Sequence, residues 1–163
     1  VSTTCFRAAF WGGYPIEERH PHTYRVSWYE PPVGLDAAAF SPSVDMRFRN
    51  DTDSPILILT KVDEEKAQLF FRFYGKKGER TVHMEGPITS NPVEPGDPVL
   101  EEDPSLPPGQ RRQIEWPHTG IDVTVHRIIE ENGQETSEEF FSRYEPWPAR
   151  YLVGPQQTEG ASN

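Results

Sequence analysis

The distribution of proline divides this chain of 163 residues into two parts that obey different folding rules. Eleven of its 17 prolines lie beyond Arg80, most of them in the segment EGPITSNPVEPGDPVLEEDPSLPPG at 85–109. Because proline fixes φ and donates no backbone hydrogen bond, it excludes a helix and a central strand. The segment is therefore predicted to be extended, either polyproline-like or at the edge of a sheet.

Strand patterns resume after the proline-rich segment, at 113–116, 122–130 and 138–144. The dipeptide Asn132-Gly133 is typical of a two-residue turn that joins two antiparallel strands. We therefore predict an elongated all-β module over 81–155, with 156–163 as a tail or linker.

The first part combines one helix with alternating patterns. Residues 3–11 predict a short buried helix, with Ser2, Thr3 and Thr4 as capping candidates and Gly12-Gly13 as its end. Strands are predicted at 23–29, 43–49, 56–62 and 69–74. The aromatic residues expected in the core are Trp11, Trp28, Phe48 and Phe70. The predicted fold class is α+β, with the N-terminal helix packed on an antiparallel β-meander over 1–80.

The net charge of −10 is confined to the second part. Residues up to Arg80 carry 11 basic and 11 acidic side chains, whereas those from Thr81 onward carry 5 and 15. Such a balance argues against nucleic acid as a partner, because binding to its backbone needs a basic surface. No apolar run is long enough to span a membrane. The chain opens at Val1 without methionine, and we expect it to be a fragment of a longer protein.

Two histidines, His20 and His22, flank a proline at the start of the predicted strand 23–29. One of them could serve as a general base. They could equally be polar loop residues or hydrogen-bonded packing residues. A zinc site is a third reading, but no further spaced cysteine or histidine ligand is visible, so no metal and no cofactor are predicted.

Residues 1–74 resemble the VanW-like family of bacterial envelope proteins in the stretches VSTTCFRAAFWGGYPIEERHPH, VSWYEPPVGLDA and SVDMRFRNDTDSPILI. Residues 81–154 resemble the five-glycine (G5) domain in EDPSLPPGQ, TGIDVTVHRIIEENGQE and PARYLVGP. The resemblance implies an extracytoplasmic protein that lies in the cell wall or is anchored to the membrane. It also implies a link to glycopeptide resistance and action on peptidoglycan or its stem peptides. It further implies cysteine-dependent acyl transfer of the L,D-transpeptidase type, with the nucleophile in a GVCQ-like motif upstream of Val1, so that the chain as given would be inactive.

The same resemblance assigns candidate site residues. His22 would be the base, with His20 the less regular alternative, and Asp36 would either orient the imidazole or bind the backbone of its own turn. Arg19, Tyr24 and Arg25 could bind a stem-peptide carboxylate, or the arginines could pair with Glu17, Glu18 or Glu30. Cys5 departs from the nucleophile motif and is expected to be a small core residue.

The second part offers binding rather than catalytic candidates. Trp116, Tyr144 and Trp147 could stack on wall polysaccharide if exposed, or form the core of the module. A non-enzymatic wall-binding, adhesion or spacer module is therefore the alternative to an enzyme.

Overall fold

The computed structural model describes residues 1–155, and the tail or linker predicted at 156–163 lies outside the described residues. Helix α1 (Ser2–Trp11) opens the chain, and a 3-10 turn covers Ser27–Tyr29. The strands are β1 (Ile16–Glu18), β2 (Arg47–Phe48), β3 (Leu57–Asp63), β4 (Gln68–Tyr74), β5 (Thr81–Val93), β6 (Val99–Glu102), β7 (Arg111–Glu115), β8 (Gly120–Glu131), β9 (Gln134–Tyr144) and β10 (Arg150–Val153).

The strands form four small sheets. β1 pairs with β2, β3 with β4, and the two larger sheets have the orders β5-β8-β9 and β6-β10-β7. Every pairing is antiparallel except that of β10 with β6. One helix with mostly antiparallel strands confirms the predicted α+β class. The single meander predicted for the first part is wrong, because the short β2 pairs back with β1 and leaves β3 and β4 as a separate hairpin.

The proline-rich segment begins as an edge strand, as predicted. β5 carries Pro87 and Pro92 and lies at the edge of the β5-β8-β9 sheet. Its register against β8 shifts between Glu85 and Ile88 and again between Ser90 and Val93, so each proline falls where the ladder is interrupted. The sheet thus accommodates residues that cannot donate to it.

Both predicted hairpins are confirmed. Asn132 and Gly133 adopt φ values of 52° and 73°, the left-handed pair that joins β8 to β9. The other hairpin joins β3 to β4 through the turn at 64–67.

The strand predicted at 23–29 is wrong. Its alternation Tyr24, Val26, Trp28 ends in the 3-10 turn, and Trp28 is 89% exposed instead of buried. Trp11 is also exposed, although it too was expected in the core. The guanidinium of Arg25 turns back onto Glu30, so local side-chain contacts replace a ladder over this segment.

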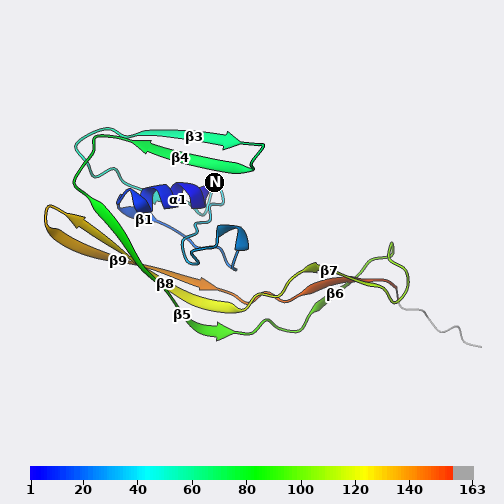
Figure 1. The fold of residues 1–163 in the computed structure, drawn as a ribbon. Coiled ribbons are helices and arrows are strands. Elements are labelled where there is room, and N and C mark those ends of the chain that lie inside the picture. Colours follow the sequence, from blue (N-terminus) through cyan, green and yellow to red (C-terminus); the bar gives the residue numbers. More distant parts are fainter. Residues whose placement is uncertain (156–163) are drawn as a thin grey trace, which may run out of the picture.

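One hydrophobic core draws on both parts of the chain. It joins α1 and the loop after the 3-10 turn to β8 and β9 through Phe6, Phe10, Leu35, Ala37, Val123, Val125, Phe140 and Tyr144. In Figure 1, α1 lies between the β3–β4 hairpin and the long β5-β8-β9 sheet, while β6, β7 and β10 extend away as an elongated arm. The domain boundary predicted at residue 80 stays a prediction from the sequence, and the hydrophobic core contains residues from both sides of it.

Candidate functional site

Asp36 is the centre of a buried hydrogen-bond network. Its Oδ2 accepts bonds from the backbone N–H of His22 at 2.8 Å and from the ring Nδ1 of His22 at 2.5 Å. Its Oδ1 accepts a bond from the hydroxyl of Tyr144 and one from Nη2 of Arg19 at 3.3 Å. Residues from three distant segments therefore hold one carboxylate.

The loop that carries Asp36 is pressed against β8. Gly34 adopts a φ of +86°, and a side-chain Cβ there would lie 2.7 Å from Cγ1 of Val123. Only glycine suits both the dihedral and the contact. This approach buries Leu35 and Ala37 in the core and fixes the carboxylate between them.

The network keeps Asp36 ionised. Burial by itself would raise the pKa of Asp36, but the hydrogen bonds from Tyr144 and His22 and the charge of Arg19 outweigh it, so the pKa lies below its usual value. Burial, together with the bond to Asp36, raises the pKa of Tyr144. The tyrosine is thus a neutral donor and the aspartate a charged acceptor at neutral pH.

The His22 side chain stays partly exposed beside this network. It is 27% exposed and stacks on Tyr29 with ring centroids 5.2 Å apart. Within residues 1–155, Nε2 of His22 makes no hydrogen bond. A carboxylate on Nδ1 holds the tautomer and direction of an imidazole, so that the open Nε2 can take or give a proton. Asp36 thus contacts the imidazole of His22, and its role in orienting the ring stays a prediction.

The amino end of α1 is hydrogen-bonded to Ala37, the residue that follows Asp36 in the sequence. The hydroxyls of Ser2 and Thr3 donate to the carbonyl of Ala37 at 2.5 Å and 3.1 Å, and the N–H of Ala37 donates to Thr3 at 3.1 Å. These hydroxyls do not cap the helix, because they tie it to the loop instead, and the N-cap is Val1. In the described part of the chain, no hydrogen bond joins His22 directly to the first turn.

His20 lies apart from His22. Its Nε2 is 3.2 Å from Glu18, its side chain is half exposed, and its carbonyl accepts from Ala38. The two imidazoles engage different carboxylates, and residues 1–155 contain no cluster of three or more potential metal ligands.

The three residues predicted to bind substrate have different surroundings. Arg19 has only 5% of its side chain exposed and donates to the carbonyls of Asp36, Gly34 and Phe141. Burial lowers its pKa below the usual value for arginine. It therefore positions the loop and β9, and few of its donors remain for a ligand.

Arg25 forms a bidentate pair with Glu30 at 3.0 Å and 2.7 Å, the alternative stated from sequence. Tyr24 is exposed and lies against Trp147, with ring centroids 4.3 Å apart. This contact places an aromatic pair from the two parts of the chain beside the site.

Tyr144 was missed as a site residue, because sequence reasoning treated it as an exposed or core aromatic. It is 4% exposed and donates to Asp36. The alternation in β9 contained the signal: Phe140, Ser142 and Tyr144 share the inward face, whereas Phe141 is exposed.

A hollow of about 460 Å³ adjoins the amino end of α1, lined by Val1, Ser2, Cys5, Ala39, Asp45, Met46 and Phe71. Burial raises the pKa of the half-buried Cys5 thiol above its usual value. The thiol is therefore protonated at neutral pH, which agrees with a packing role rather than a nucleophilic one.

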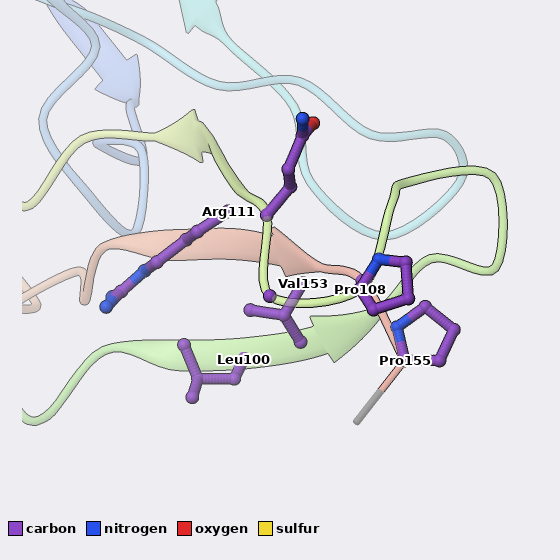
Figure 2. Close-up of a pocket in the computed structure, with 8 residues that line it drawn as sticks. Leu100, Pro108, Arg111, Val153 and Pro155 are labelled. Carbon is purple, nitrogen blue, oxygen red and sulfur yellow. The ribbon is translucent and has the colours of Figure 1, made fainter. Parts of the chain in front are cut away.

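A second hollow, of about 620 Å³, lies at the far end of the elongated arm (Figure 2). Leu100 and Val153 form its floor between β6 and β10, and Pro108, Arg111 and Pro155 stand around it. No acidic residue or histidine lines it. This hollow could accept a ligand by contact but offers no acid–base pair.

Comparison with known proteins identifies both parts of the chain. Residues 1–74 match the family model described as VanW like protein, and residues 88–156 match the G5 domain model. Both resemblances stated from sequence are confirmed. None of the curated proteins matches the chain.

Two solved G5 structures are similar to about half of the chain. The IgA1 protease G5 domain structure is 24% identical with a TM-score of 0.30, covering 50% of this chain and 96% of that one. The crystal structure of HP0197-G5 is 18% identical with a TM-score of 0.24, covering 47% and 100%.

Two further facts concern the chain's location. No helix among residues 1–155 is long and apolar enough to cross a membrane. The pairing of the two domain types suggests a protein associated with the cell wall, outside the cytoplasm. The chain joins a VanW-like segment, residues 1–74, to a G5 domain, residues 88–156.

Proposed function

We propose that this chain belongs to a cell-wall protein in which His22 and Asp36 form the acid–base pair of a cysteine-dependent acyl transfer on peptidoglycan stem peptides. The observation that carries the proposal is the His22 imidazole, held through Nδ1 by a buried carboxylate and left open at Nε2. The family resemblance supplies the nucleophile, a cysteine of the GVCQ-like motif upstream of Val1.

The surroundings of Val1 suit such a cysteine. The amino end of α1 brings unpaired N–H groups and the positive end of the helix dipole, which favour a thiolate. The hollow beside Val1 and Ser2 offers room for an extended peptide. The contacts of Ser2 with Ala37 keep this end of the helix one residue from Asp36.

Each half of the proposed reaction passes one proton through His22. Nε2 of His22 takes the thiol proton, and the thiolate attacks the carbonyl carbon of a stem-peptide amide. His22 returns the proton to the leaving amine as the C–N bond breaks and a thioester forms. An acceptor amine then attacks the thioester, His22 takes its proton, and the thiol is restored.

The test is a crosslinking assay on the protein with the residues that precede Val1, using purified stem peptides. His22→Ala is expected to lose at least about a hundredfold in kcat/KM, the scale of general acid–base catalysis. His20→Ala is the matched control and is expected to retain activity, because His20 lies on Glu18 outside the network. Equal activity of the two variants would remove His22 from the mechanism.

A second candidate is wall binding by the G5 domain without chemistry. It is favoured by Trp116, which is 63% exposed beside β7, and by Arg111, whose guanidinium lies 3.5 Å from the centre of the Tyr151 ring. Sedimentation of the chain with purified peptidoglycan tests it. Binding that is lost in Trp116→Ala and kept in His22→Ala would assign the binding to the arm.

A further inference from the structure

We propose that the β3–β4 hairpin is a docking surface for an anionic lipid bilayer. The first observation is where the lysines lie. All four lysines of the chain, Lys61, Lys66, Lys76 and Lys77, fall in the hairpin or in the loop that leaves it. In a chain of net charge −10, every lysine is therefore gathered in one short stretch.

The outward face of the hairpin combines Lys61 and Arg72 with apolar side chains, whereas Lys66 lies in the turn and Lys76 and Lys77 follow β4. Strand register puts Leu57 opposite Tyr74, Leu59 opposite Arg72 and Lys61 opposite Phe70. These six residues share one face, because side chains alternate along a strand. Leu57, Leu59 and Tyr74 are 56%, 48% and 50% exposed.

The opposite face of β4 fixes this assignment. Phe73 packs on Tyr14 and Phe48, and Phe71 lines the hollow at the start of α1. The residues between them must therefore point away from the protein body. Figure 1 shows the hairpin on the outside of α1, with nothing described beyond it.

Carboxylates of the described residues do not neutralise the cations of this surface, although the guanidinium of Arg72 lies over the ring of Phe70. Across residues 1–155, neither Arg72 nor any of the four lysines forms an ion pair. Nine of the other arginines do. The acidic residues of the hairpin lie together at its turn end: Asp63 closes β3 on the outward face, opposite Gln68, and Glu64 and Glu65 follow in the turn.

Charge complementarity and apolar exposure together select the occupant. Lysines flanking exposed leucine and tyrosine side chains match a surface that is anionic at the headgroups and apolar beneath them. A soluble polyanion would satisfy the lysines but leave Leu57 and Leu59 in water. The arm of β6, β7 and β10 continues from the end of the long β5-β8-β9 sheet, on the other side of α1 from the hairpin (Figure 1), so it leaves the outward face of the hairpin uncovered.

The test is flotation of the whole chain with vesicles of phosphatidylglycerol mixed with phosphatidylcholine, and with vesicles of phosphatidylcholine alone. Binding is expected only to the anionic vesicles and is expected to weaken as salt is raised. Lys76→Gln with Lys77→Gln should weaken binding about 30-fold, at about fivefold for each cation removed. Arg111→Gln with Arg112→Gln gives the same net charge and should leave binding unchanged.

A second pair of variants separates a bilayer from any other polyanion. Leu57→Ser with Leu59→Ser keeps every charge and is expected to lose vesicle binding, and circular dichroism checks that it folds. The proposal is overturned by binding to neutral vesicles alone, by failure to bind anionic vesicles at low salt, or by equal loss in the lysine and arginine pairs. Full vesicle binding by the folded leucine variant would likewise overturn it, because the surface would then recognise charge only.

Discussion

Replacing Tyr144 with phenylalanine removes one buried hydroxyl and leaves the packing of the ring in place. The hydroxyl donates to Oδ1 of Asp36, whose other oxygen holds His22. The ring belongs to the shared core with Phe6 and Phe140, so the substitution opens almost no cavity. Its effect therefore measures one hydrogen bond to one charged group.

The expected loss is about 2 kcal/mol in the free energy of unfolding at neutral pH. A hydrogen bond to an ionised group contributes roughly 1.5–3 kcal/mol. Asp36 keeps its bonds from His22 and Arg19, which places the loss inside that range rather than above it. For a domain of this size, 2 kcal/mol corresponds to a fall in Tm of about 4–8 °C.

The loss should depend on pH, because the pKa of Asp36 is depressed in the folded protein. A depressed pKa contributes stability that is present above the unfolded value of 3.8 and is lost as pH falls through the folded value. Once Asp36 is protonated, Tyr144 donates to a neutral group and the bond contributes only about 1 kcal/mol. The deficit of Tyr144→Phe is therefore full at neutral pH and shrinks in acid.

At high pH, the ionisation of Tyr144 lowers the stability of the wild-type protein. The raised pKa of Tyr144 contributes stability that is present below the ordinary tyrosine value of about 10 and is lost as pH rises through the folded value. Wild type should approach the phenylalanine variant there as well.

Urea titrations across this pH range, followed by circular dichroism, measure the deficit. Tyr151→Phe is the control, since within residues 1–155 its hydroxyl has no hydrogen-bond partner. A deficit at neutral pH no larger than that of the control, or one that stays constant in acid, would refute the assignment of Tyr144 as a donor to ionised Asp36.

Three further changes test how the fold is held. Arg127→Met should cost about 3 kcal/mol in urea unfolding, because buried Arg127 donates to the carbonyls of Phe10 and Tyr14, at and just after the end of α1. Arg49→Met removes an exposed ion pair and should cost less than about 1 kcal/mol. Equal losses in the two variants would contradict this prediction. Gly34→Ala should destabilise by at least about 2 kcal/mol more than Gly109→Ala, since both have positive φ but only Gly34 meets β8; similar values would show that the contact relaxes. Trp28→Ala should change Tm by less than about 2 °C, because the ring is exposed, and a larger change would restore it to the core.

Local chemistry made the hairpins predictable from the sequence. Asn132-Gly133 and the two β-rich runs around 63–67 specify antiparallel pairs between neighbours in sequence, which need no distant partner. The prolines of β5 likewise predicted an edge strand, because proline has no backbone N–H to donate to a neighbouring strand. These elements depend on short-range rules, and the structure confirms them.

The segment 23–29 failed because alternation alone does not supply a neighbouring strand. The backbone N–H of His22 is taken by the carboxylate of Asp36, and Arg25 folds back onto Glu30. Side chains that satisfy the backbone in this way compete with a ladder. Nothing in the segment itself indicates that the backbone N–H of His22 will donate to Asp36, 14 positions later.

Tyr144 shows why the candidate site could be assigned only in part. His22, Asp36 and Arg19 were predicted from the first part of the chain and do come together. The fourth member arrives from β9, 108 residues beyond Asp36, in the segment that matches the G5 domain. A contact between two sequence families cannot be found by examining either one alone.

This contact makes the site a property of both parts of the chain. Asp36 is held on one oxygen by its own segment and on the other by Tyr144, so a shift of β9 alters the carboxylate that orients His22. Arg127 fixes the end of α1 from β8 in the same way. Since α1, Asp36 and His22 take their positions from the long sheet, the VanW-like segment without β8 and β9 would lack half of its core and one side of its candidate site.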